Sequence, residues 1–314
     1  MKGCKKASGF TIIEVMIVLA VSGVLLVSAA IMVSGQQSKT GFKTSIYDFQ
    51  TEMQQIANDV INGNYPNPAA NDYTCTQNDG KPPTIISGVT GKGHGTGENI
   101  NSSTGTLSGC ILLGKAVQFD VNSLSSSTIY IYSVVGNLGD SSDNTPVQSL
   151  SNAWPELLAP GHDNNHNPDF SPEFIETYQL QYGLHVTWMC YGTSYGTPCD
   201  STTNGISVVV FATNPTTANG GSPLITGAQE LEYLPILGTG LDAGPTDSKS
   251  IVDKVDGYFD SPGGDGFIID PAGGVEICVD DQTTNHSGLL TIGGNSEQPN
   301  IKLQIYIASN NCSQ

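Results

Sequence analysis

Residues Phe10 to Val33 read FTIIEVMIVLAVSGVLLVSAAIMV and contain a single charged side chain, Glu14. At a rise of about 1.5 Å per residue, a helix of this length reaches about 36 Å, which is enough to cross a hydrocarbon core of about 30 Å. Lysines precede the segment, so we expect its N-terminal end on the cytoplasmic side and the rest of the chain beyond the membrane. The stretch therefore predicts a membrane-spanning helix.

Two simpler interpretations of this segment are a cleaved secretory signal peptide and a plain signal anchor. Ser28-Ala29-Ala30 resembles a signal-peptidase site, but the apolar part of a secretory signal usually holds only about 7–15 residues. A signal anchor accounts for the length, but not for a carboxylate near the start. A charge inside hydrocarbon is costly and indicates a functional position by default, so both interpretations leave Glu14 unexplained.

The residues around this carboxylate resemble a known processing site. Lys5-Lys6-Ala7-Ser8-Gly9-Phe10-Thr11-Ile12-Ile13-Glu14 is similar to the cleavage junction of type IV prepilins and of the pseudopilins of type II secretion. The resemblance implies that a prepilin peptidase removes residues 1-9 by cutting after Gly9, and that Phe10 becomes an N-methylated N-terminus. It also implies an assembly role for Glu14. In a filament, this carboxylate would pair with the α-amino group of a neighbouring subunit and so set the axial register, because an offset neighbour leaves a buried charge unpaired.

The helix is expected to continue to Asn62 as an amphipathic segment. Apolar residues recur at steps of three and four, the spacing of one helix face, at Phe42, Ile46, Phe49, Met53, Ile56 and Val60. Gly63 and the prolines at 66 and 68 end the pattern. Residues 34-62 therefore predict a helix that lays one stripe against a globular domain.

The remaining chain, 63-314, reads as an extracellular β-rich domain. Its apolar or alternating runs predict strands at Cys110–Val121, Ile129–Val135, Tyr178–Cys190, Ile206–Ala212, Gly266–Asp270, Val275–Val279, Leu289–Ile292 and Ile301–Ile307. The predicted fold class is α+β, with the long helix packed on an antiparallel sheet or sandwich. Two polar stretches, Lys81 to Ser108 and Gly136 to Asp169, read as long surface loops that either connect strands or form a variable binding surface.

The charge balance argues against nucleic-acid binding by the isolated subunit. The chain carries a net charge of −18, with 11 lysines and no arginine. Three of those lysines precede Phe10, which leaves eight against 29 acidic residues. Such a surface repels a phosphate backbone and lacks the arginine forks that bind it.

Six of the seven cysteines lie in the polar region, an even number that suits disulfide bonds in an oxidising compartment. Neighbour pairing gives Cys75–Cys110, Cys190–Cys199 and Cys278–Cys312 out of 15 possible pairings. Among these, Cys190–Cys199 is the pair that closes the shortest loop, which we expect at the tip of a hairpin.

Several shorter patterns suggest chemistry only weakly. Gly192-Thr193-Ser194-Tyr195-Gly196 matches the G-x-S-x-G nucleophile elbow, but a run of Ser, Thr and Asn follows it where that elbow needs a helix. Asp163, Asn165, Asn167 and Asp169 alternate like the start of a calcium loop, although Pro168 occupies the place of the required glycine. An irregular calcium site there, or around Asp260, Asp265 and Asp270, stays open. His162 and His166 lack a third metal ligand at clear spacing. We therefore expect no cofactor and no enzyme activity.

The sequence-based hypothesis is a structural subunit of a type IV pilus-like filament. It would be anchored in the cytoplasmic membrane through residues 10-33, assembled by the membrane machinery into a homopolymeric or mixed filament, and displayed on the cell surface with a possible role in attachment. A minor, tip-located pilin and a pseudopilin of a type II secretion system are the alternatives within the family. A membrane-tethered enzyme is the alternative from another class.

Overall fold

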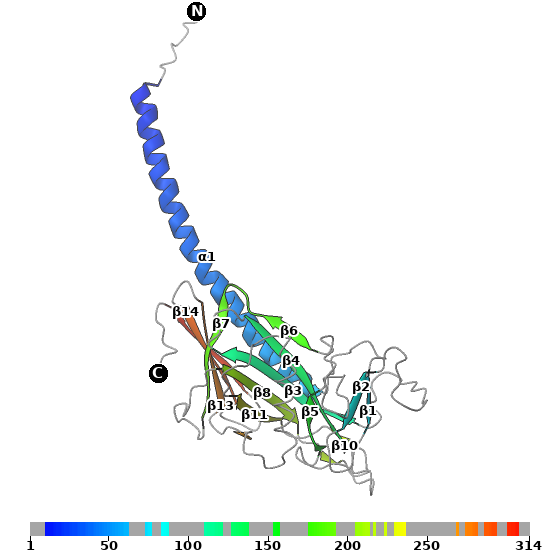
Figure 1. The fold of residues 1–314 in the computed structure, drawn as a ribbon. Helices are drawn as coiled ribbons and strands as arrows, with labels where there is room; N and C mark the ends of the chain where they lie inside the picture. The colour runs from blue at the N-terminus through cyan, green and yellow to red at the C-terminus, as the bar shows by residue number, and fades with distance from the viewer. Residues whose placement is uncertain are drawn as a thin grey trace, which may run out of the picture.

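One long helix and two larger antiparallel sheets make up the described part of the chain (Figure 1). The computed structural model describes residues 10–62, 73–76, 83–87, 110–121, 127–137, 153–157, 175–192, 205–213, 216–217, 223–224, 229–236, 268–269, 274–281, 286–293 and 300–307. The architecture is α+β, and it confirms the predicted fold class.

Helix α1 spans Ile12–Asn62, and its two halves have different surroundings. The first half extends away from the sheets as a free rod (Figure 1), with apolar side chains exposed from Ile12 to Val33. The second half is amphipathic as predicted, because every residue of the expected stripe from Phe42 to Val60 is buried. The described helix reaches Asn62, where the sequence predicts its end.

The larger sheet has seven strands in the order β12-β11-β8-β3-β4-β5, with β6 also pairing to β4. Its strands are β12 (Ile268–Ile269), β11 (Gln229–Ile236), β8 (Gly205–Thr213), β3 (Cys110–Val121), β4 (Thr128–Asn137), β5 (Glu156–Leu157) and β6 (Glu176–Gln179). All of its pairings are antiparallel.

The smaller sheet has four strands in the order β15-β14-β13-β7. They are β15 (Ile301–Ile307), β14 (His286–Ile292), β13 (Gly274–Asp281) and β7 (Leu184–Gly192). Two short two-stranded pairs complete the described strands: β1 (Tyr73–Thr76) with β2 (Thr84–Ser87), and β9 (Thr216–Thr217) with β10 (Pro223–Leu224).

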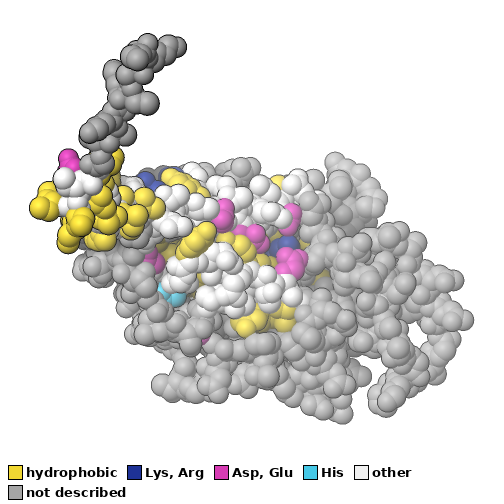
Figure 2. All heavy atoms as spheres, turned by 90° about the horizontal axis from the view of Figure 1, so that it is seen from above, with side chains coloured by type: hydrophobic (Ala, Val, Ile, Leu, Met, Phe, Trp, Pro, Cys, Tyr) yellow, Lys and Arg dark blue, Asp and Glu magenta, His cyan; other side chains and the backbone are white. Residues whose placement is uncertain are grey.

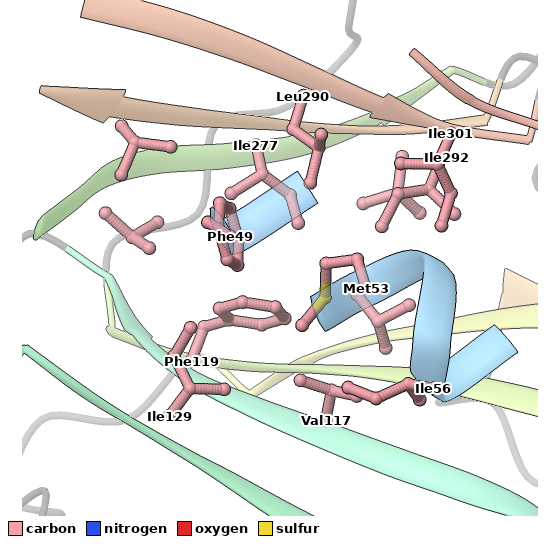
Figure 3. Packing of buried hydrophobic residues seen from close by; sticks show 14 of the residues in the cluster. Phe49, Met53, Ile56, Val117, Phe119, Ile129, Ile277, Leu290, Ile292 and Ile301 are labelled. Carbon is pink, nitrogen blue, oxygen red and sulfur yellow. The ribbon is translucent and has the colours of Figure 1, made fainter. Parts of the chain in front are cut away.

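The core lies between these two sheets, with the second half of α1 as its central layer (Figure 3). Phe49 is fully buried, and its ring meets Phe119 of β3 edge-on and stacks on Tyr178 of β6. On the other side of the helix, Ile277 and Leu290 supply the apolar face of the smaller sheet. The helix therefore joins two sheets that would otherwise each leave an apolar face exposed.

Two glycines allow the helix to approach its neighbours closely. A Cβ atom at Gly41 would lie 2.9 Å from Cδ1 of Tyr182, whose ring covers the helix where the buried half begins. A Cβ atom at Gly288 of β14 would overlap Cδ1 of Ile46. Ser45 also donates a hydrogen bond of 2.9 Å to the carbonyl of Gln181, which ties the turn before β7 to the helix.

The structure corrects the predicted strands in several places. The run Tyr178–Cys190 forms two strands, β6 and β7, which a turn at Tyr182 and Gly183 divides between different sheets. Both turn residues have positive φ, 55° and 72°. The hairpin expected around Cys190 and Cys199 is also wrong, because β7 pairs with β13 while the next strand, β8, lies in the larger sheet. Strand β11 was not predicted, and strands β2 and β5 lie within the two stretches, Lys81 to Ser108 and Gly136 to Asp169, that were predicted as loops.

Candidate assembly site

The exposed half of α1 is the most unusual surface of the described chain. Phe10 is 85 % exposed, and the large apolar side chains between Ile12 and Val33 are exposed as well. In Figure 2, where the structure is seen from above, these apolar side chains gather around the projecting end of the helix. By length and composition α1 can cross a membrane, and the most apolar part of it is not buried against the sheets.

At the start of this half, Thr11 and Glu14 form a capping box. Oε2 of Glu14 accepts hydrogen bonds from the backbone N–H and the side-chain hydroxyl of Thr11, both at 2.9 Å. In return, the N–H of Glu14 donates to Oγ1 of Thr11 at 3.3 Å. This reciprocal arrangement satisfies two backbone donors that a helix start leaves without partners. A negative charge in the first turn is also stabilised by the helix dipole.

Sequence reasoning missed this role of Thr11, although the signal was present. Thr11-Ile12-Ile13-Glu14 has the T-x-x-E spacing of a capping box ahead of an apolar run. The carboxylate at position 14 was considered only as a group that needs a partner from another subunit. The structure gives it a partner within its own chain, while its second oxygen, Oε1, has no hydrogen bond to any described residue.

The other predicted assembly and disulfide residues are only partly described. Gly9 lies outside the described residues, directly before Phe10. Cys190 and Cys278 are both disulfide-bonded and buried, on the neighbouring strands β7 and β13. Their predicted partners, Cys199 and Cys312, lie outside the described residues, so both pairings stay predictions. Cys75 in β1 and Cys110 in β3 fall in described strands, and their pairing is likewise untested.

The weak metal and catalytic candidates lie almost wholly outside the described part of the chain. This holds for the possible calcium ligands Asp163, Asn165, Asn167, Asp169, Asp260, Asp265 and Asp270, and for His162 and His166. Among the described residues there is no group of three or more His, Cys, Asp and Glu side chains that could hold a metal ion. Of the G-x-S-x-G pattern only Gly192 is described, as the last residue of β7.

One buried ion cluster fastens the distal end of the helix to the larger sheet. Lys115 of β3 is buried, and its Nζ lies 3.1 Å from Oδ2 of Asp59 in α1 and 3.4 Å from Glu176 in β6. Burial, followed by repulsion from Glu176, raises the pKa of the nearby Glu52 carboxyl. In Figure 2 acidic side chains gather around a basic one in the middle of the described surface. Because each buried charge has an opposite partner, this cluster is explained as an attachment of helix to sheet.

Two histidine–carboxylate pairs lie at one end of the smaller sheet. Nε2 of His185 is 3.0 Å from Oδ1 of Asp280, and Nδ1 of His286 is 3.4 Å from Oδ2 of Asp281. The ring of His286 also lies against Phe42 of α1, with centroids 5.3 Å apart. Each imidazole faces one carboxylate, but Nδ1 of the buried His185 has no hydrogen-bond partner among the described residues.

Comparison with known proteins identifies the N-terminal segment. The family model described as the prokaryotic N-terminal methylation motif matches residues 4–30. No curated protein and no solved structure matches the chain. The matched segment contains the Gly9-Phe10 junction, the capping box and most of the exposed apolar helix. The chain thus carries the N-terminal methylation motif, which is the class III prepilin signal of the type IV pilin and pseudopilin family.

Proposed function

We propose that the protein is a structural subunit of a type IV pilus-like filament, held in the cytoplasmic membrane by the first half of α1 and then assembled through it. The observation that carries this proposal is the exposed apolar helix that follows the methylation motif. Its side chains bury almost nothing against the sheets, so they need either lipid or neighbouring helices around them.

The arrangement of Glu14 supports an intersubunit role for its carboxylate. Oε2 is occupied by Thr11, whereas Oε1 remains available. A carboxylate has about four acceptor positions, so one group can cap its own helix and also bind the α-amino group of Phe10 in a neighbour. On this view, the capping box holds the carboxylate in a fixed rotamer before assembly. The amine of the neighbour then binds the remaining carboxylate oxygen.

The same reasoning defines the processing and the partners. Prepilin peptidase would cut after Gly9, and the new amine at Phe10 would be methylated and keep its positive charge. The partners would be further copies of the chain or other pilins, together with the membrane assembly machinery. A secretion pseudopilin uses the same signal, and the copy number in filaments sheared from the cell surface distinguishes a shaft subunit from a minor, tip-located one.

The test compares three variants in cells that assemble the wild-type chain. Glu14→Ala removes the counter-charge of the amine, and loss of one partner from a buried pair costs roughly 3–5 kcal/mol. At about 1.4 kcal/mol per factor of ten, subunit addition should weaken by about two to three orders of magnitude. Glu14→Gln keeps an acceptor and should be intermediate. Ser28→Ala is the matched control, because Ser28 is an exposed polar residue of the same helix that bonds only to its own helix, at Val24.

Two measurements accompany the filament yield. An N-terminal mass spectrum of the mature protein should show methylated Phe10 in all variants, which proves that processing is intact. Assembled filaments whose chains begin at Met1 or near Ile31 would contradict the proposal. A wild-type filament yield from Glu14→Ala, with normal cleavage, would show that the carboxylate does not set the register.

A further inference from the structure

The second half of α1 has two flanks that carry opposite charges. We call Lys39 and Lys43 the basic flank, and Asp48, Glu52 and Asp59 the acidic flank. At about 100° per residue, Lys43 and Asp48 lie about 140° apart around the helix axis. The buried stripe from Phe42 to Val60 lies between the two flanks on the side of the sheets.

Contacts with the sheets show which strand each flank lies toward, and this evidence does not depend on the helical spacing. On the acidic side, Asp59 pairs with Lys115 of β3, and the carboxylates of Asp48 and Glu52, after burial, contribute to raising the pKa of Tyr178 in β6 to about 12. On the other side, Nε2 of Gln50 donates a hydrogen bond of 3.3 Å to the carbonyl of Ile301 in β15. Gln50 lies close to Lys39 and Lys43 in helical angle, so the basic flank lies toward β15 and the acidic flank toward β6.

The charges at the membrane-proximal ends of these flanks are available to a partner. Lys39, Lys43 and Asp48 are exposed, and none of them forms an ion pair with another described residue. Glu52 is half-buried on the same flank as Asp48. Its carboxyl has a raised pKa, because it is partly desolvated among other acids. A cation from outside the chain would stabilise this flank.

We propose that the basic flank of one subunit docks on the acidic flank of a second copy of the same chain, by ion pairing of Lys43 and Lys39 with Asp48 and Glu52. This inference rests on the proposed filament function and names the contact between the folded halves of neighbouring subunits. Two complementary surfaces on opposite sides of one element form a heterologous, head-to-tail contact, which generates an open helical array. The chain carries a net charge of −18, so a contact that places lysines against carboxylates opposes the overall repulsion between two copies.

The axial positions of the charges set the stagger that the flank contact requires. Lys43 precedes Asp48 by five residues, so that pairing them raises the copy with the lysine by about 7.5 Å along the helix. Phe10 lies just ahead of α1 and precedes Glu14 by four residues, so pairing its amine with that carboxylate raises the copy that supplies the amine in the same direction. The two contacts share the direction of the stagger, but Glu14 and Asp48 lie about 160° apart around the axis of α1, so a different neighbour makes each contact.

Charge reversal tests the contact in the full chain. Lys43→Glu and Asp48→Lys each bring like charges together, so each alone should lower the yield of sheared filaments by about tenfold or more. The double variant Lys43→Glu/Asp48→Lys restores opposite charges and should return the yield to within about twofold of the wild type. Lys302→Glu is the control for Lys43→Glu, because it makes the same change in net charge at an exposed position of β15.

A cross-linking experiment provides a second readout. Lys43→Cys and Asp48→Cys in one chain lie on opposite flanks, too far apart for a disulfide within the subunit. Oxidation of filaments carrying both should therefore give a ladder of covalent oligomers, while either substitution alone should give none.

The outcomes separate the two proposals. Failure of the processed wild-type chain to form filaments overturns the proposed function. Two outcomes overturn the flank contact alone. In the first, neither charge reversal changes the filament yield. In the second, the double variant yields no more filaments than the worse single variant, and oxidation gives no ladder of oligomers. A loss confined to Lys43→Glu, without rescue, would mean that the lysines bind lipid phosphates and would also overturn it.

Discussion

We expect Gly288→Ala to destabilise the folded half of the protein by overpacking the contact between α1 and β14. A Cβ atom at this position would overlap Cδ1 of Ile46 and lie 3.3 Å from its Cγ1. Ile46 is fully buried, so its side chain has little room to rotate away. Overpacking of this kind costs about 1–3 kcal/mol, which exceeds the roughly 0.5–1 kcal/mol that alanine gains over glycine inside a strand.

The clash involves mainly one atom, so a second substitution can remove it. Ile46→Val deletes Cδ1 and alone should cost about 0.5–1.5 kcal/mol. In the double variant, the new methyl group occupies the space that the deleted one leaves. Its remaining neighbours are Cγ1 of residue 46 at 3.3 Å, a tight contact that a small shift relieves, and the carbonyl oxygen of Gln304 at 3.7 Å, which is in ordinary contact. The double variant should therefore be more stable than the sum of the single changes by about 1–2 kcal/mol.

The measurement is a double-mutant cycle by urea unfolding of the full chain in detergent micelles. The m-value should stay constant, because both substitutions change packing and leave the amount of buried surface nearly the same. Additive effects within about 0.3 kcal/mol would show that Ile46 and Gly288 do not share this space, and would refute the close approach of helix and sheet.

Three further predictions concern groups in the folded half. Lys115→Met should lower the unfolding free energy by about 2 kcal/mol. This is less than the roughly 3–5 kcal/mol expected for a fully buried pair, because the acidic partners are partly exposed. Equal stability of the variant and the wild type at pH 7 would contradict the ion cluster. Burial raises the pKa of Glu52, so ionisation of this carboxyl destabilises the fold, and stability is lost as the pH rises from the unfolded value of about 4.3 through the raised folded value. Glu52→Gln should therefore become more stable relative to the wild type as the pH rises from about 4 to 7, by at most about 1 kcal/mol because the side chain is partly exposed. An equal difference in unfolding free energy between variant and wild type at both pH values would refute this assignment. A non-reducing peptide map should show Cys190 joined to Cys199, and free thiols at both would contradict that pairing.

The sequence was sufficient for the helix because its pattern is long and strict. The stripe from Phe42 to Val60 repeats over several turns, and only one face of a helix can bury it. The strand Ile301–Ile307 was predicted with its bounds, since apolar and polar residues alternate along it and Ile301 is buried while Lys302 is exposed. Both signals depend on local periodicity, which tertiary contacts reinforce.

The division of strands between sheets could not be predicted from local pattern. Tyr178 to Cys190 is one nearly continuous β-prone run, and the break at Tyr182 depends on a positive φ that the tyrosine adopts as its ring packs against Gly41. A tyrosine in that conformation is stabilised by its surroundings and not by its own propensity. The strand Gln229–Ile236 was missed because its acidic residues and proline are poor strand signals, although it pairs along its whole length with β8.

The capping box was missed for a different reason. The T-x-x-E signal was visible, but Glu14 was considered as an isolated charge inside an apolar segment. A polar side chain near the start of a helix is first a candidate for the free N–H groups of that helix. Once these N–H groups are satisfied, the acceptor positions that the carboxylate still has can bind a neighbour. In Glu14 one oxygen, Oε1, is left for this.

Glu52 gives a way to separate stability of the subunit from stability of the filament. In the isolated chain its carboxylate is partly desolvated beside other acids, so neutralising it should stabilise the fold. In the proposed contact the same carboxylate faces a lysine of the next subunit, so neutralising it should weaken the filament. The two effects have opposite signs, whereas a substitution that merely disturbs folding lowers both quantities together. Glu52→Gln with a more stable subunit and fewer filaments would therefore place this carboxylate in the interface, and a gain in both would place it outside.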